Sequence, residues 1–130
     1  MTQEDKELLL QDLCARLSCK LHCRVFKLNG DIKENDDILY GVIGDNVITL
    51  KSDKDECLMY YQIKPYLRPM SSMTEEEKKE ERKLWDIVTT TRNDLHYLYT
   101  DFLVSHHFDS RGLIPMGLAL EAPEGMYKVN

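Results

Sequence analysis

Two prolines, Pro65 and Pro69, divide the sequence into stretches with different patterns of apolar residues. Proline lacks a backbone N–H and biases the preceding residue away from helical backbone, so regular structure changes around it. Short alternating runs precede residue 65, whereas longer runs with helical spacing follow residue 74. The sequence therefore predicts an α+β protein with a β-rich half (1–69), a helical half (74–130) and a seam at residues 65–74.

Length and charge limit the classes of protein that this chain can belong to. A chain of 130 residues is large enough to bury one core without disulfides or metals, so we expect residues 1–130 to form a single domain. Its 17 basic and 23 acidic residues give a net charge of −6, which disfavours broad binding to nucleic acid or anionic membranes. No run approaches the roughly 18 apolar residues of a membrane span, and the acidic N-terminus lacks a signal-peptide pattern. We expect a cytoplasmic protein whose four cysteines are reduced.

The β-rich half is expected to begin with a helix at residues 4–17, capped by Thr2. Its apolar stripe has helical spacing and consists of Leu10, Leu13, Cys14 and Leu17. Four strands are then expected at residues 20–28, 38–43, 47–51 and 57–63, joined by turn sequences. Strands connected in this way form a four-stranded antiparallel meander or a small half-barrel, with the helix over one face.

The helical half begins with a capping box, in which Thr74 is followed three residues later by Glu77. Residues 75–83 are almost entirely charged, so the first two turns of this helix are expected to project into solvent. A second helix follows, with the apolar stripe Leu95, Leu98, Tyr99 and Phe102. The tail is expected to hold a short third helix ended by Gly117, and then an extended segment at residues 118–120. Two to three C-terminal helices are therefore predicted.

Three stretches of the chain resemble a family of short uncharacterised proteins from gut anaerobic bacteria and their prophages or mobile elements. The stretches are residues 12–17 (DLCARL), 63–77 (IKPYLRPMSSMTEEE) and 105–127 (from SHHFD to EAPEGMY). Ser110 departs from the family, in which an aromatic residue follows the aspartate, and the first strand with its cysteines and histidine also differs. The resemblance implies a phage or mobile-DNA context and no particular reaction.

The strongest candidate for metal chemistry is the segment that contains His106, His107 and Asp109. Histidine and carboxylate side chains are ligands of the type used for zinc, manganese or iron. Adjacent helical residues point about 100° apart, so the two histidines bind one ion only if the helix ends there. The alternative is structural: histidines suit the C-terminus of a helix, and Asp109 would cap the segment after it. We expect no metal and no other cofactor.

A cysteine-rich set offers a second possible zinc site, formed by Cys14, Cys19, His22, Cys23 and Cys57. The spacing from Cys19 to His22 is ligand-like, but a matching second pair is absent from the sequence. Buried thiols that act as small apolar side chains are the preferred interpretation. Motifs of nucleophilic or phosphate-binding enzymes are also absent, so the interpretation leans against an enzyme.

The remaining hypotheses are binding functions. Basic and aromatic residues that could form a binding surface are Lys64, Tyr66, Arg68, Trp85 and Arg111. Nucleic-acid binding is possible for a small β half-barrel, although the net charge disfavours it. A non-catalytic protein-interaction module is preferred, and self-association through the apolar stripe at residues 95–102 is equally compatible. A metal-dependent enzyme that uses His106, His107 and Asp109 is the third alternative.

Overall fold

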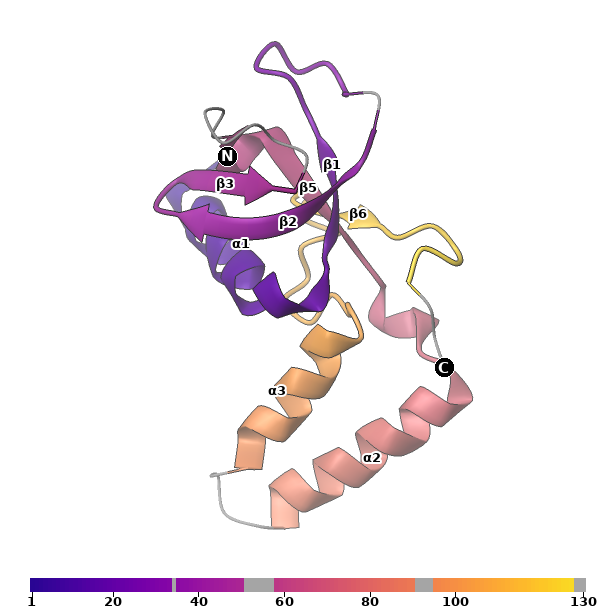
Figure 1. Cartoon of the computed structure of the whole chain (residues 1–130). Helices are drawn as coiled ribbons and strands as arrows, with labels where there is room; N and C mark the ends of the chain where they lie inside the picture. The colour runs from indigo at the N-terminus through magenta and orange to yellow at the C-terminus, as the bar shows by residue number, and fades with distance from the viewer. Residues whose placement is uncertain (34, 51–57, 91–94, 128–130) are drawn as a thin grey trace.

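A computed structural model describes residues 1–33, 35–50, 58–90 and 95–127. The fold is α+β, and within these residues a six-stranded sheet is combined with three α-helices (Figure 1). The elements are α1 (Gln3–Ala15), β1 (His22–Val25), β2 (Asp37–Ile43), β3 (Asn46–Thr49), β4 (Leu58–Met59), β5 (Ile63–Leu67), α2 (Glu75–Thr90), α3 (His96–Ser105) and β6 (Leu120–Glu121), with 3₁₀ turns at Leu17–Cys19, Tyr60–Gln62 and Met70–Ser72. Among the described residues, no helix is both long and apolar enough to cross a bilayer.

Helix α1 starts as its sequence predicts, but it buries a different face. The Thr2 side chain accepts a hydrogen bond from the Asp5 backbone N–H at 3.0 Å, which confirms the cap. The predicted stripe is wrong at two positions, because Cys14 and Leu17 are exposed. The buried face consists of Leu9, Asp12, Leu13 and Arg16. The buried face therefore includes two charged residues, which the apolar pattern does not reveal. Asp12 and Arg16 can be buried because they form an ion pair with each other.

The sheet has the strand order β4-β3-β2-β1-β5-β6, and every neighbouring pair is antiparallel except β5 with β6. The predicted four-strand meander is therefore only roughly matched. Its fourth strand, residues 57–63, is split by the turn at Tyr60–Gln62 into β4 beside β3 and β5 beside β1. Residue 57 itself lies outside the described residues.

The sequence suggests that Pro65 ends the sheet, but this is wrong, because Pro65 lies within β5 opposite Cys23. The Phe26 backbone N–H donates to the Gln62 carbonyl at 2.6 Å, and hydrogen-bonded pairs alternate along antiparallel strands. Pro65 therefore occupies a position whose N–H is not needed by β1. On the other side of β5, the pairing with β6 begins only at Tyr66, so the missing donor interrupts neither ladder.

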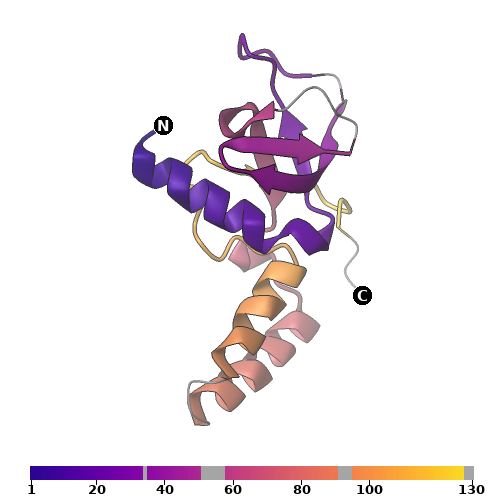
Figure 2. The same cartoon turned by 60° about the vertical axis from the view of Figure 1, so that its left-hand side comes forward.

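The main core lies between α1 and one face of the sheet (Figure 2). It contains side chains from α1, from the strands and from the C-terminal tail: Leu9, Leu13, Leu21, Cys23, Val25, Leu39, Val47, Leu58, Ile63, Leu67, Leu113, Leu118 and Ala119. The opposite face of the sheet, which we call the outer face, carries the half-buried side chains of Arg24 and Lys64 and the exposed side chain of Tyr40. The sheet and α1 together form the body of the molecule.

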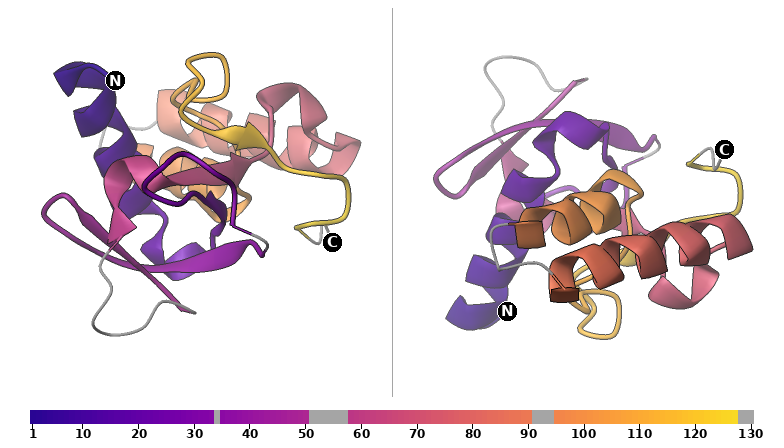
Figure 3. Two further views of the ribbon diagram at one scale, coloured as in Figure 1. Left: turned by 90° about the horizontal axis from the view of Figure 1, so that it is seen from above. Right: turned by 90° about the horizontal axis from the view of Figure 1, so that it is seen from below.

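Helices α2 and α3, which we call the arm, extend away from the body and lie side by side (Figure 3). A small second core at the base of the arm contains Met73, Phe102, Leu103 and Phe108. Farther out, most side chains of α2 are exposed, as its charged sequence predicts. The buried side chains of α2 are Glu77 in the first turn, which is only 3% exposed, and Val88 near the end.

After α3 the chain returns to the body. Residues 110–117 form turns, so the predicted short third helix is wrong. Gly117 has a φ of 76°, which glycine adopts without steric cost, and it redirects the chain into β6. The Leu113, Leu118 and Ala119 side chains join the main core on the way. The chain after α3, far from α1 in the sequence, thereby contributes to the core between α1 and the sheet.

A buried ionic network fastens this returning segment to α1. The Asp12 carboxylate accepts from Arg16 Nε at 2.9 Å and from Arg111 Nη1 at 2.8 Å. Arg16 is fully buried, and its Nη2 donates to the Phe108 carbonyl at 2.6 Å. Removing one partner of a buried ion pair leaves a charge without compensation, which costs about 3–5 kcal/mol.

We expect Asp12→Asn to lower the free energy of unfolding by about 3–5 kcal/mol, because both Arg16 and Arg111 lose their counter-charge. Glu7→Gln, on the exposed side of the same helix, is the matched control and is expected to change stability by less than about 0.5 kcal/mol. Urea unfolding followed by circular dichroism measures both values. Equal stabilities for the two variants would contradict a structural role of the network.

Candidate functional site

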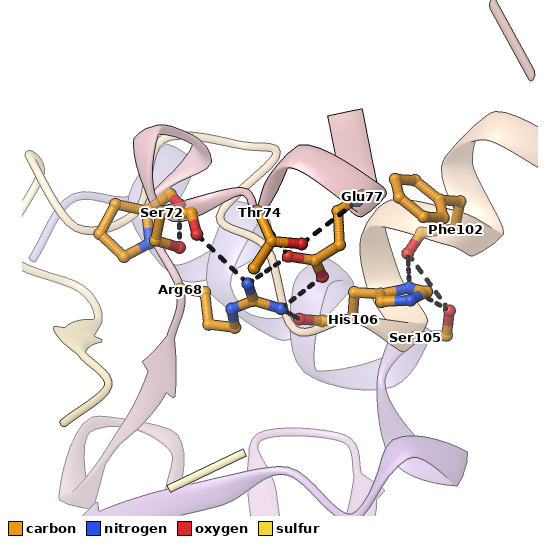
Figure 4. A network of polar contacts seen from close by, with 8 residues as sticks. Arg68, Ser72, Thr74, Glu77, Phe102, Ser105 and His106 are labelled. Atoms are coloured by element: carbon orange, nitrogen blue, oxygen red, sulfur yellow. Dashed lines mark hydrogen bonds and ion pairs between the residues drawn. The ribbon is translucent and has the colours of Figure 1, made fainter. Parts of the chain in front are cut away.

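The join between body and arm is built on Arg68, the residue after β5. Its guanidinium group forms a two-pronged ion pair with the Glu77 carboxylate, at 2.8 Å from Nη1 and 2.6 Å from Nη2 (Figure 4). Its Nη1 also donates to the His106 carbonyl at 3.3 Å, so it reaches the end of α3 as well as the start of α2. The Arg68 guanidinium lies 4.3 Å from the centre of the Phe108 ring, a cation–π distance. Arg68 and Glu77 therefore link three segments at one point.

The capping box of α2 holds Glu77 in place for this pair. The Glu77 backbone N–H donates to Thr74 Oγ1 at 3.2 Å, and the Thr74 backbone N–H donates to the Glu77 carboxylate at 2.9 Å, which confirms the predicted box (Figure 4). Hydrogen bonding from Arg68 lowers the pKa of Glu77 to about 2, against the opposing effect of burial. The carboxylate thus stays ionised, and the helix cap and the ion pair depend on the same side chain.

The candidate metal ligands His106, His107 and Asp109 all lie at this join. Structural contacts engage Asp109 and His106, whereas the buried Nδ1 of His107 has no hydrogen-bond partner among the described residues. The Asp109 carboxylate accepts from the backbone N–H groups of Leu113 at 2.7 Å and Ile114 at 2.9 Å. His106 Nδ1 lies 2.8 Å from the carbonyl oxygen of Phe102. Among the residues that the structure describes, no group of three or more histidine, cysteine or acidic side chains is arranged to hold a metal ion.

His107 lies between the body and the C-terminal tail. Its ring stacks on Tyr127 with centroids 3.7 Å apart, and its backbone has a φ of 64°, in the left-handed region. Burial, followed by the positive charge of Arg16, lowers the pKa of His107 to about 4. Tyr127 in turn bridges two strands, because its hydroxyl accepts from the His22 N–H at 3.0 Å and donates to the Tyr66 carbonyl at 2.8 Å. His107 is therefore a neutral packing residue at neutral pH.

The cysteines do not act alike. Cys23 is buried in the main core, its thiol lies 3.5 Å from the Asp37 carbonyl, and burial raises the pKa of the thiol to about 12. Such a thiol is a poor nucleophile and metal ligand. Cys14 is exposed and Cys19 is half-buried, so the preferred interpretation of buried thiols is wrong for Cys14. Cys57 lies outside the described residues.

A pocket of about 390 Å³ lies between the seam and the C-terminal tail, and this volume is within the range of small-molecule sites. It is lined by Arg68, Pro69, Ser72, Thr74, Glu121, Ala122, Pro123, Glu124, Gly125 and Tyr127. Both Nη atoms of Arg68 are already bonded to Glu77, so the guanidinium brings no uncompensated charge to the pocket. Tyr127 is likewise engaged through its hydroxyl.

The five predicted surface residues do not form one surface. Lys64 lies on the outer face, 5.9 Å above the Phe26 ring, and Tyr66 is 3% exposed, with its hydroxyl donating to Asp36 at 3.1 Å. Arg68 is buried against Glu77, and Arg111 pairs with Asp12. Trp85 alone is prominent in solvent, 49% exposed on the arm.

Trp85 belongs to a small group of side chains on one side of the arm. Its ring meets the edge of the Tyr99 ring with centroids 5.3 Å apart, and the Tyr99 hydroxyl donates to Glu81 at 3.3 Å. Arg82 precedes Trp85 by three residues, so the two side chains are neighbours on the surface of α2. We call Arg82, Trp85 and Tyr99 the aromatic patch.

Sequence reasoning missed the pairing partners that fasten the C-terminal tail to the body. Asp12 and Arg16 carry a local signal, because oppositely charged residues four apart flank Leu13 on a helix that buries one face. The role of Tyr127 had no such signal. It arises from contacts with His22 and Tyr66, which are 105 and 61 residues away in the sequence.

We expect Glu77→Gln to lower the free energy of unfolding by about 3 kcal/mol, because it leaves buried Arg68 without its counter-charge. The folded pKa of Glu77 is about 2 and the reference value is 4.5, so the pair stabilises the wild type above pH 4.5 and the stabilisation is lost as pH falls toward 2. Urea unfolding at several pH values measures both effects. Glu76→Gln, one residue away and exposed, is the control, and an equal loss in that variant would contradict the role of the pair.

Protonation of His107 is expected to destabilise the protein at a higher pH than protonation of Glu77 does. The unfolded chain takes up a proton near pH 6.5 and the folded protein only near pH 4, so stability falls between these values, by about 1–3 kcal/mol. His107→Asn tolerates the left-handed backbone and does not titrate, so its stability should vary less across this range. Chemical unfolding from pH 7 to pH 4 measures the slopes, with exposed His96→Asn as control. A variant slope as steep as that of the wild type would count against this assignment.

Comparisons with known proteins identify no counterpart, since no family model, curated protein or solved structure matches the chain. The aromatic patch and the join that holds it are therefore interpreted from the chain's own residues.

Proposed function

We propose that this protein is a non-catalytic protein-interaction module that binds a partner protein through the aromatic patch. The observation that carries the proposal is the 49% exposure of Trp85 on a helix that extends away from the body. Tryptophan, tyrosine and arginine are the residues that most often dominate the binding energy of protein interfaces, and all three are present in the patch. A tryptophan held out in this way offers a large apolar surface to a partner.

Anchoring of the arm favours binding as well. Association is less costly when the binding surface is already ordered, because less conformational entropy is lost. Arg68 and Glu77 hold the first turn of α2 on the body, and the ring contact with Tyr99 restrains Trp85. The patch is thus pre-organised by contacts that lie outside it.

The contacts of the candidate catalytic groups support a binding role over an enzymatic one. Asp109 is engaged by backbone N–H groups, and burial holds His107 neutral and Cys23 protonated at neutral pH. The alternative of nucleic-acid binding would use Arg24 and Lys64 on the outer face. There Arg24 donates to Tyr66, whose hydroxyl bonds the acidic Asp36, so the positive charge on this face is partly offset. The resemblance to prophage and mobile-element proteins makes a host or phage protein the proposed partner.

Trp85→Ala tests the proposal in a quantitative pull-down from lysate of the cells that encode the protein. We expect the wild type to retain a specific partner and Trp85→Ala to bind it at least about thirtyfold more weakly, as for a hot-spot residue. Tyr40→Ala is the matched control, because Tyr40 is an aromatic residue that is 66% exposed on the outer face instead of the arm. If the wild type retains nothing specific, or if both variants retain the partner equally, the proposal is wrong.

A further inference from the structure

The opposite side of α2 carries a stripe of side chains with helical spacing. Glu76, Glu80, Lys83 and Ile87 follow one another at steps of four, three and four residues, which places them along one side of the helix. All four are exposed. Among the described residues, neither Glu80 nor Lys83 takes part in an ion pair. Glu76, Glu80 and Lys83 thus form a row of charges directed toward solvent, with Ile87 at its end.

Apolar side chains of both helices border this stripe. Ile87, 41% exposed, is two residues from Trp85 and hence about 200° around the helix from it. On α3, Tyr99 turns toward Trp85, so Leu98, about 100° back around the helix, faces the side of Ile87. Leu98 is half-buried there, and Leu84, which packs against the second core, is half-buried between the two helices. This side of the arm therefore combines an apolar strip with the charge row and is separate from the aromatic patch.

We propose that this side of the arm pairs with the same side of a second copy of the chain, so that two arms form a four-helix bundle. The order of the charges along α2 favours a second copy of the chain as the partner. When two α2 helices lie antiparallel, with the two-fold axis between positions 80 and 83, Glu80 of each copy faces Lys83 of the other. A two-fold interface is self-complementary in this reciprocal way, whereas a parallel arrangement would place like charges together. The same axis places Ile87 of each copy opposite Glu76 of the other, next to these charge pairs.

Charge reversal tests the pairing independently of the proposed function, because it affects the side of the arm opposite Trp85. We expect a wild-type mass of about 30 kDa by sedimentation or light scattering, twice the chain mass of 15.2 kDa. Lys83→Glu makes both reciprocal contacts repulsive and should raise the dissociation constant about tenfold or more. Adding Glu80→Lys to this variant restores opposite charges and should restore the dimer.

Arg82→Glu is the matched control, because it reverses an exposed charge one position away, outside the stripe, and should leave the dimer unchanged. A wild type that stays at 15.2 kDa up to its solubility limit overturns the inference, even if the partner pull-down succeeds. It is also overturned if the double variant dissociates as readily as Lys83→Glu. If another protein binds this side, the wild type is monomeric alone, which likewise contradicts the second copy.

Discussion

The ion pair between Arg68 and Glu77 is the contact on which the arrangement of body and arm depends. Arg68 follows the central part of the sheet, and its backbone N–H donates to the His107 carbonyl at 2.7 Å while its side chain reaches Glu77. Glu77 is also part of the cap of α2, so one carboxylate starts the helix and fixes it to the sheet. Buried charges are costly unless paired, and here the pair is supplemented by a helix cap and by the His106 carbonyl at the end of α3.

A second buried network makes the C-terminal tail part of the same structure. Asp12, Arg16 and Arg111 connect α1 to the segment after α3, and Tyr127 connects that segment's far end to β1 and β5. The ionisable groups of these contacts form ion pairs and hydrogen bonds that hold the segments together. Asp109 is used in the same structural way, because its carboxylate accepts from two backbone N–H groups, whereas the exposed Trp85 lies on the arm.

Local signals in the sequence were sufficient for the helix caps, and non-local contacts account for the errors. Thr2 and the Thr74–Glu77 box act within four residues, so their patterns predicted the starts of α1 and α2. The path of β5 depends on pairing with β1 and β6, and a short run ending at two prolines does not reveal either partner. The buried face of α1 was misplaced because Asp12 and Arg16 are polar, and their burial depends on Phe108 and Arg111. Trp85 is exposed as expected of a surface candidate, whereas Arg68 and Arg111, which belong to the same predicted set, are held in ion pairs with Glu77 and Asp12.

Amide hydrogen exchange at the join tests the central claim, that buried contacts hold the arm on the body. The backbone N–H groups of Arg68 and Asp109 are bonded to the carbonyls of His107 and Arg68. If the join opens only when the whole protein unfolds, these amides exchange as slowly as those of β1. Exchange at the rate of exposed chain, with β1 still protected, would show that the arm detaches on its own and would contradict the account.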